Sequence, residues 1–234
     1  MAKSIIFGET GFVGKCLKKY VSDLPVIYNL ASISSVEESI SDPAYVISNN
    51  IECMLDALDQ ARELKRTFIH LSTVEASRPS NPYAASKTAQ EAIAIAYYNT
   101  YGVPVIIARS HNIIGQGQSK DKFIPKLIKQ IKAGQTVKIY GNGSRIYNPI
   151  LNVVDALAHL GMQGVPGTTY LIGGGERVTN LEMAQKIAKI LNKPLKYEIV
   201  EGRPGYKRAL KGEGEPIPDW KPGLTLQESL SWIK

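Results

Sequence analysis

Two side chains in the segment YAASK could carry acid–base chemistry. Tyr83 and Lys87 are four residues apart, so on a helix they lie one above the other on the same face. A nearby ammonium favours the phenolate and is therefore expected to lower the pKa of the tyrosine. Tyr83 is a candidate general acid or base for a hydroxyl or carbonyl group, with an exposed helical pair as the alternative.

The residues that end the preceding strand strengthen this prediction. The apolar strand before YAASK ends in the residues HLSTVE. Parallel α/β sheets place their catalytic and binding residues at the carboxyl ends of strands. Glu75 at this end could act as a base or orient a neighbouring group. The other interpretation is a surface carboxylate at the end of a strand.

A third cluster consists of the glycines of GETGFVG, which lie between a short apolar strand and a helical pattern. Gly8, Gly11 and Gly14 permit a tight turn, and they let backbone N–H groups approach a diphosphate. The spacing is GxxGxxG rather than GxGxxG, so a purely structural strand-to-helix turn is the alternative.

Short β-branched runs alternate with longer amphipathic runs, which favours an α/β fold with a parallel sheet. Asn180 is a plausible N-cap for one of the helices. The expected strands are Ser4–Phe7, Val26–Leu30, Thr67–Leu71, Val105–Ala108, Thr136–Tyr140 and Thr169–Ile172. The expected helices are Phe12–Ser22, Pro43–Leu64, Pro82–Tyr101, Phe123–Ala133, Asn152–Gln163, Leu181–Leu191 and Leu226–Ile233.

Composition narrows the class of protein. The 234 residues are 44% hydrophobic and 21% charged, as in ordinary globular proteins. We expect no signal peptide, no membrane span and no metal site, and Cys16 and Cys53 suit buried thiols, so a cytoplasmic protein is expected. The formal charge of +7 comes from scattered Lys and Arg residues, so a nucleic-acid-binding surface is not expected. The charge is compatible with a small polyanionic substrate.

Taken in order, these segments resemble the extended short-chain dehydrogenases/reductases, the NAD-dependent nucleotide-sugar epimerases and dehydratases. NLAS is similar to the family's NLAA strand end, and RSHNIIGQGQ resembles its RxxNxYGP segment. FIPKLIKQIKAGQTVKIYGNGSRIYNPILNVVDAL, GRPGY and PDWKPGLTLQESLSWI resemble its closing parts. The resemblance implies bound NAD, a nucleotide-diphosphate sugar as substrate and a homodimer through the helices 43–64 and 82–101.

The resemblance also implies roles for individual residues. Tyr83 would be the catalytic acid/base, Lys87 would hold the nicotinamide ribose, Thr73 would bind the sugar hydroxyl that is oxidised, and Glu75 would assist. The implied cofactor-binding residues are Gly8, Thr10, Gly11, Phe12, Val13, Gly14, Leu30, Ala31 and Lys87. The implied substrate-binding residues are Ser72, Thr73, Asn112, Arg145 and Arg203.

The subclass depends on the residue between Thr73 and Glu75. Family dehydratases carry Asp there as a proton donor, whereas this chain has Val74, which cannot donate a proton. Transient oxidation at C4 followed by epimerisation is therefore weakly favoured over dehydration or decarboxylation. Two other functions stay open: a nucleotide-sugar binder without redox chemistry, and an NADPH-dependent 4-keto-sugar reductase. The reductase ranks last because no basic pair suited to a 2′-phosphate is visible.

One part of the family pattern is missing. A dinucleotide fold normally carries an acidic residue for the adenosine ribose ~20 residues after the glycines, but here a single helix separates Gly14 from Asn29. We therefore expect a trimmed Rossmann-like parallel sheet whose first strand is an edge, with weakened dinucleotide binding. The core would comprise residues 1–115 and 144–174, and a small C-terminal substrate lobe would comprise 116–143 and 175–234.

Overall fold

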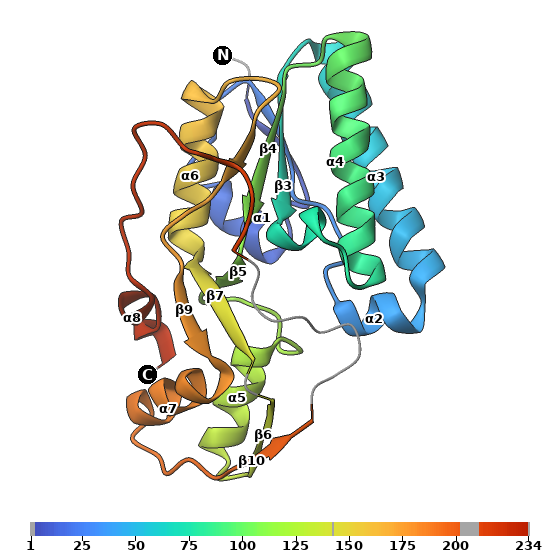
Figure 1. Ribbon diagram of the computed structural model, residues 1–234. Coiled ribbons are helices and arrows are strands. Elements are labelled where there is room, and N and C mark those ends of the chain that lie inside the picture. Colours follow the sequence, from blue (N-terminus) through green and yellow to red (C-terminus); the bar gives the residue numbers. More distant parts are fainter. Residues whose placement is uncertain (1–2, 142, 202–210, 234) are drawn as a thin grey trace.

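The computed structural model describes residues 3–141, 143–201 and 211–233, and its central feature is a six-stranded parallel sheet (Figure 1). The strand order is β1-β2-β3-β4-β8-β11, and every neighbouring pair is parallel. The α/β fold with a mostly parallel sheet is therefore confirmed. The strands are β1 (Ile5–Phe7), β2 (Val26–Asn29), β3 (Thr67–Thr73), β4 (Val105–Ser110), β8 (Thr169–Leu171) and β11 (Glu215–Pro216).

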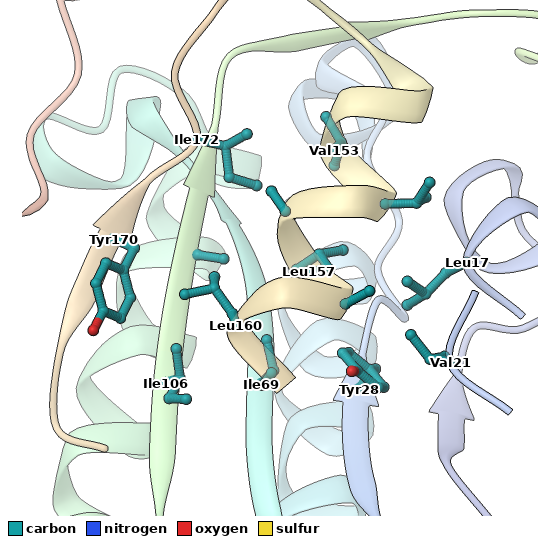
Figure 2. Close-up of a cluster of buried hydrophobic side chains, with 14 of the residues drawn as sticks. Leu17, Val21, Tyr28, Ile69, Ile106, Val153, Leu157, Leu160, Tyr170 and Ile172 are labelled. Carbon is teal, nitrogen blue, oxygen red and sulfur yellow. The ribbon is translucent and has the colours of Figure 1, made fainter. Parts of the chain in front are cut away.

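Helices cover both faces of this sheet, so its central strands β2, β3 and β4 consist mostly of buried, largely apolar residues. Helices α3 (Pro43–Leu64) and α4 (Pro82–Tyr101) lie on one face, and α1 (Phe12–Leu17) and α6 (Ile150–Gln163) lie on the other (Figure 1). Figure 2 shows the core on the α6 side, where Leu157 and Leu160 point toward Ile69 and Tyr28. This packing holds the carboxyl ends of β1 to β4 side by side.

The connection from β1 to β2 is shortened as the sequence predicts. Ile5 is paired with Ile27, so β1 lies directly beside β2 and, among the described residues, forms the edge of the sheet. Helix α1 ends at Leu17, five residues earlier than predicted, because the N–H groups of Lys19 and Tyr20 bond carbonyls three residues back. The chain then turns toward β2, which leaves no further strand–helix unit between the glycines and β2.

The ends of the long helices α3 and α4 are set by local capping interactions. The Asp42 side chain accepts a hydrogen bond from the N–H of Tyr45, and the Asn81 side chain accepts one from the N–H of Ala84, so both helices have N-caps. Each continues with proline at its first position. Helix α4 ends at Tyr101 and is capped by Gly102, whose φ of 67° is the left-handed conformation that glycine tolerates.

The C-terminal lobe has its own hydrophobic core, which includes Leu127, Ile139 and Ile187. Its elements are α5 (Phe123–Lys132), β6 (Val137–Tyr140), α7 (Asn180–Ile190), β10 (Tyr197–Val200), α8 (Leu226–Ser229) and η2 (Ser231–Ile233). A three-stranded sheet of β5 (Asn112–Ile114), β7 (Ser144–Pro149) and β9 (Glu176–Thr179) lies between the lobe and the main core.

Several details differ from the sequence prediction. Segment 211–217, expected in the lobe, instead returns to the main sheet: β11 pairs with β8, and Ile217 joins the α6-side core. The C-terminal helix is broken into α8 and η2, and α6 starts two residues early. The short helix α2 (Val36–Ser41) and strands β5, β7, β9, β10 and β11 were not predicted, because they are short and partly polar.

Candidate active site

A pocket of about 420 Å³ opens where the carboxyl ends of the strands meet the C-terminal lobe. It brings together the glycine loop after β1, the ends of β2, β3 and β4, and the first turns of α4. Its lining includes these predicted site residues: Gly8, Gly11, Phe12, Val13, Gly14, Leu30, Ser72, Thr73, Tyr83, Lys87 and Asn112. Segments that are far apart in sequence are therefore placed in one cavity, as the predicted chemistry requires.

The glycine loop is packed so closely that side chains do not fit. Gly8 has φ of 84°, and a Cβ there would lie 2.9 Å from the backbone nitrogen of Ala31. A Cβ on Gly14 would lie 2.7 Å from the Cα of Glu9. The loop thus wraps tightly between β1, α1 and the end of β2, and its glycines line the pocket together with Phe12 and Val13.

Lys87 is almost fully buried at the first turns of α4. Only 3% of its surface is exposed, and its ammonium donates a 2.9 Å hydrogen bond to the carbonyl of Leu71, at the end of β3. Burial lowers the pKa of Lys87 to about 7, while the Glu91 carboxylate acts in the opposite direction. Near neutral pH this side chain therefore exists in both charge states.

The expected direction of the Tyr83 pKa is wrong for the ligand-free protein. Burial raises the pKa of Tyr83 above its ordinary value, and the charge of Glu75 raises it further. Although Lys87 lies four residues along the same helix, desolvation of the phenol has the largest effect on this pKa. Tyr83 therefore carries its proton here.

The residues after β3 divide between the pocket and the interior. Thr73 lines the pocket, and its hydroxyl also accepts the N–H of Glu75, capping the 3₁₀ turn η1 (Val74–Ser77). Glu75 does not line the pocket, although its charge reaches Tyr83. Val74 is only 5% exposed and lies beside Gly212, away from the pocket lining.

Besides Glu75, four predicted residues are not found in the lining. Thr10 is exposed, and Ala31 contacts the loop from behind, since its backbone nitrogen lies next to Gly8. Arg145 is 8% exposed, and its guanidinium donates to the carbonyl of Ser144. Arg203 lies outside the described residues.

The structure adds lining residues that the sequence did not single out. His111 precedes Asn112, and its pKa is lowered to about 4 by burial and by Arg177, so the imidazole is neutral at pH 7. The Lys122 ammonium donates to the carbonyl of Ser34, bridging the lobe and the loop after β2. His111 lies within the predicted RSHNIIGQGQ motif, although only Asn112 was singled out there, and nothing in the sequence marked Lys122 among many lysines.

The pocket continues toward the lobe. A second cavity of about 250 Å³ shares Ser34, Asn112 and Lys122 with the first and adds Lys126 and Tyr140. Another cavity, of about 600 Å³, lies against α1 and the C-terminal segment and meets the first at Phe12. It contains none of the predicted catalytic residues, so the smaller pocket is the candidate site.

Two further findings concern the described part of the chain. None of its helices has the length and apolar character that a membrane crossing requires. Its His, Cys, Asp and Glu side chains do not form any group of three or more suited to hold a metal ion.

Comparison with known proteins identifies the family. Residues 13–173 match the model of the NAD-dependent epimerase/dehydratase family. The dTDP-glucose 4,6-dehydratase of Haemophilus influenzae is 31% identical over 265 residues, which cover 95% of this chain and 78% of that protein. The corresponding enzyme of Xanthomonas campestris is 26% identical, with 96% and 75% covered.

A solved structure shares the fold. The crystal structure of DesIV, a dTDP-glucose 4,6-dehydratase from Streptomyces venezuelae with NAD and TYD bound, superposes with a TM-score of 0.89 at 21% identity. The match covers 98% of this chain and 95% of that one. The present chain spans about three quarters of the length of its curated relatives, consistent with its short β1-to-β2 connection. On these matches, the chain belongs to the NAD-dependent epimerase/dehydratase family, whose members include sugar-nucleotide dehydratases and epimerases.

Proposed function

We propose that the protein binds NAD and a nucleotide-diphosphate sugar and catalyses transient oxidation at C4 of the sugar, with Tyr83 as the acid/base. The observation that carries this proposal is the single pocket lined by the glycine loop, Thr73, Tyr83 and Lys87. A family member with only a structural glycine turn would not need these groups in one cavity.

The residues present fit one half of the dinucleotide. The glycine loop offers the pocket a backbone surface that any Cβ at Gly8 or Gly14 would disturb, as a diphosphate requires. Lys87 lies in the same pocket and is placed to hold the nicotinamide ribose. When bound, the nicotinamide ring would accept a hydride from the sugar and later return it.

The chain's own side chains would manage the proton and the position of the sugar. Tyr83 would take the proton of the C4 hydroxyl and give it back, while Thr73 would hydrogen-bond the same oxygen. Because the Tyr83 pKa is raised in the ligand-free protein, the phenolate needs a neighbouring cation. Lys87 is the pocket-lining cation four residues along α4, and burial keeps competing water away from it.

The diphosphate of the substrate suits the far end of the pocket. Lys122 and Lys126 line the continuation into the lobe, next to Asn112. Lys122 lies 3.9 Å from the carboxylate of Asp121, and Lys126 lies 3.9 Å from that of Glu37. A nucleoside diphosphate would compete with these carboxylates for the two ammonium groups.

Within this reaction class we favour epimerisation over elimination. Elimination requires a proton donor for the departing hydroxyl, and Val74 supplies none. Val74 is also buried and is not among the residues that line the pocket.

A non-redox nucleotide-sugar binder is the second candidate, and one observation favours it. Strand β1 is the edge of the sheet among the described residues, so the adenosine end of NAD would lack the wall that a further strand provides.

A cytoplasmic homodimer completes the proposal. Helices α3 and α4 carry exposed apolar side chains suited to the dimer contact: Tyr45, Ile47, Leu55, Tyr98 and Tyr101.

The test is Tyr83→Phe, assayed with NAD and a panel of UDP- and dTDP-sugars, with product sugars separated by chromatography. We expect turnover to be lost while affinity for the sugar nucleotide stays within about threefold, because only one hydroxyl is removed. Tyr20→Phe is the matched control, since Tyr20 is 47% exposed and outside the pocket. Unchanged turnover by Tyr83→Phe would refute the mechanism.

A further inference from the structure

Glu91 lies at the centre of a buried hydrogen-bond network behind the pocket. One of its oxygens accepts the hydroxyl of Ser72 at 2.6 Å and the Nε of Arg109 at 2.9 Å. Its other oxygen accepts Nη2 of Arg109 at 2.6 Å, so the arginine binds in a two-pronged fork. Glu91 is 7% exposed, which makes these charge-assisted bonds strong and the loss of either partner costly.

This network reaches the pocket through Ser72. The side chain lines the pocket, yet its hydroxyl proton is directed to Glu91 rather than to a ligand. Ser72 is followed directly by Thr73, so the bond fixes the end of β3 against α4. Arg109 extends the network to the returning C-terminal segment, because its Nη1 donates to the carbonyl of Glu213 at 3.0 Å.

Glu91 also acts on Lys87 through charge. Tyr83, Lys87 and Glu91 are spaced four residues apart on α4 and share one face. The Glu91 carboxylate opposes the desolvation that lowers the Lys87 pKa. The other titratable groups around this site are His70 on β3, Glu75 on η1 and Arg109 on β4; His70 is fully buried with its pKa well below the ordinary range, and is neutral.

We infer that Glu91 is a positioning residue of the proposed reaction: by bonding Ser72 and Arg109 it holds the end of β3 against α4, and its carboxylate, one helical turn from Lys87, favours the charged form of that lysine. A role for Glu91 in catalysis rests on the proposed function. Its effects on the charge of Lys87 and on the position of β3 do not depend on that function. Without Glu91, the lysine beside Tyr83 would be neutral over a wider pH range.

The test is a carbon-13 NMR titration of lysine Cε signals in ligand-free protein, with Lys87 assigned as the signal missing from Lys87→Met. Glu91→Gln removes the charge and keeps the shape. We expect the Lys87 titration midpoint to fall by about one pH unit or more. Arg109→Met removes the opposite charge and leaves the carboxylate, so we expect its midpoint to rise.

The direction in which the Lys87 titration midpoint shifts in Glu91→Gln separates a positioning role from a merely structural one. If Glu91→Gln only loosened the site, water would enter and the midpoint would rise toward the ordinary lysine value. A rise or an unchanged midpoint in Glu91→Gln therefore overturns the inference. If this variant does not fold, Glu91→Gln/Arg109→Met has no unpaired buried charge. Its Lys87 midpoint should still fall, but by less, because the loss of the Arg109 charge offsets part of the effect.

Failure of the inference is distinguishable from failure of the proposed function. The titration needs neither NAD nor a sugar nucleotide, so it reports on Glu91 even if Tyr83→Phe retains full turnover. Where the reaction is observed, the pH profile of turnover is expected to shift in Glu91→Gln in the same direction as the Lys87 midpoint. A profile that keeps the wild-type midpoint while the Lys87 midpoint moves would also overturn the positioning role.

Discussion

Helix propensity and packing predict opposite effects of Gly14→Ala on the free energy of unfolding. Gly14 lies inside α1, where alanine has the better intrinsic helix propensity, and propensity alone predicts a gain of about 1 kcal/mol. The structure predicts a loss. The new Cβ would lie 2.7 Å from the Cα of Glu9 and closer still to the carbonyl oxygen of Gly8, so backbone must move.

The magnitude follows from what has to move. Overpacking a well-packed site costs about 1–3 kcal/mol, and a backbone contact places Gly14→Ala at the upper end, because no flexible side chain can yield. After subtracting the propensity gain, we expect the free energy of unfolding to fall by about 2 kcal/mol. With a urea m-value of roughly 2–3 kcal/mol per molar, the midpoint should fall by roughly 1 M.

The assay is urea unfolding followed by circular dichroism, with NAD titrated into the folded variant. The control is Gly223→Ala, since a Cβ there meets nothing within 4 Å, and its midpoint should not change measurably. We expect Gly14→Ala to lose both stability and NAD affinity, because the loop that moves is the one lining the pocket. A midpoint at or above wild type would refute the loop geometry.

Three further predictions follow from charge, topology and surface. The folded-state pKa of Lys87 is lowered to about 7, so between pH 7 and the ordinary lysine value of 10.5 the unfolded state binds more protons than the folded state. The free energy of unfolding should therefore rise with pH in this range. Urea titrations of Lys87→Met should not show that rise. NADP should not bind more tightly than NAD by calorimetry, because no basic pair suited to a 2′-phosphate is visible in the sequence; a clear preference for NADP would contradict this. Leu55→Lys on α3 should yield a monomer by light scattering while Met162→Lys on α6 does not; a monomeric wild type would refute the dimer.

Much of the fold is predictable because its signals are local. The run VIYN of β2 is buried on both faces and reads as a core strand, and the Asp42-Pro43 and Asn81-Pro82 pairs mark helix starts that the structure confirms. Strands such as Ser144–Pro149 and Glu176–Thr179 were missed because polar residues interrupt them, and their pairing spans distant sequence. Short strands of this kind depend on tertiary contacts rather than on pattern.

The candidate site shows the same division. The glycine spacing and the Tyr83–Lys87 pair are local patterns, and the structure places both in one pocket. The raised pKa of Tyr83 was not predictable, since desolvation depends on which atoms surround the phenol. Glu91 escaped notice because its partners, Ser72 and Arg109, come from two different strands that only the fold brings to α4.

The most direct test of the account is calorimetric titration of the purified protein with NAD, after the denatured protein has been checked for cofactor carried through purification. We predict copurified NAD or micromolar binding, lost in Gly14→Ala, because the glycine loop and Lys87 retain the diphosphate and nicotinamide half of the site. No detectable binding, with and without UDP- and dTDP-sugars, would contradict the redox function and leave a nucleotide-sugar binder.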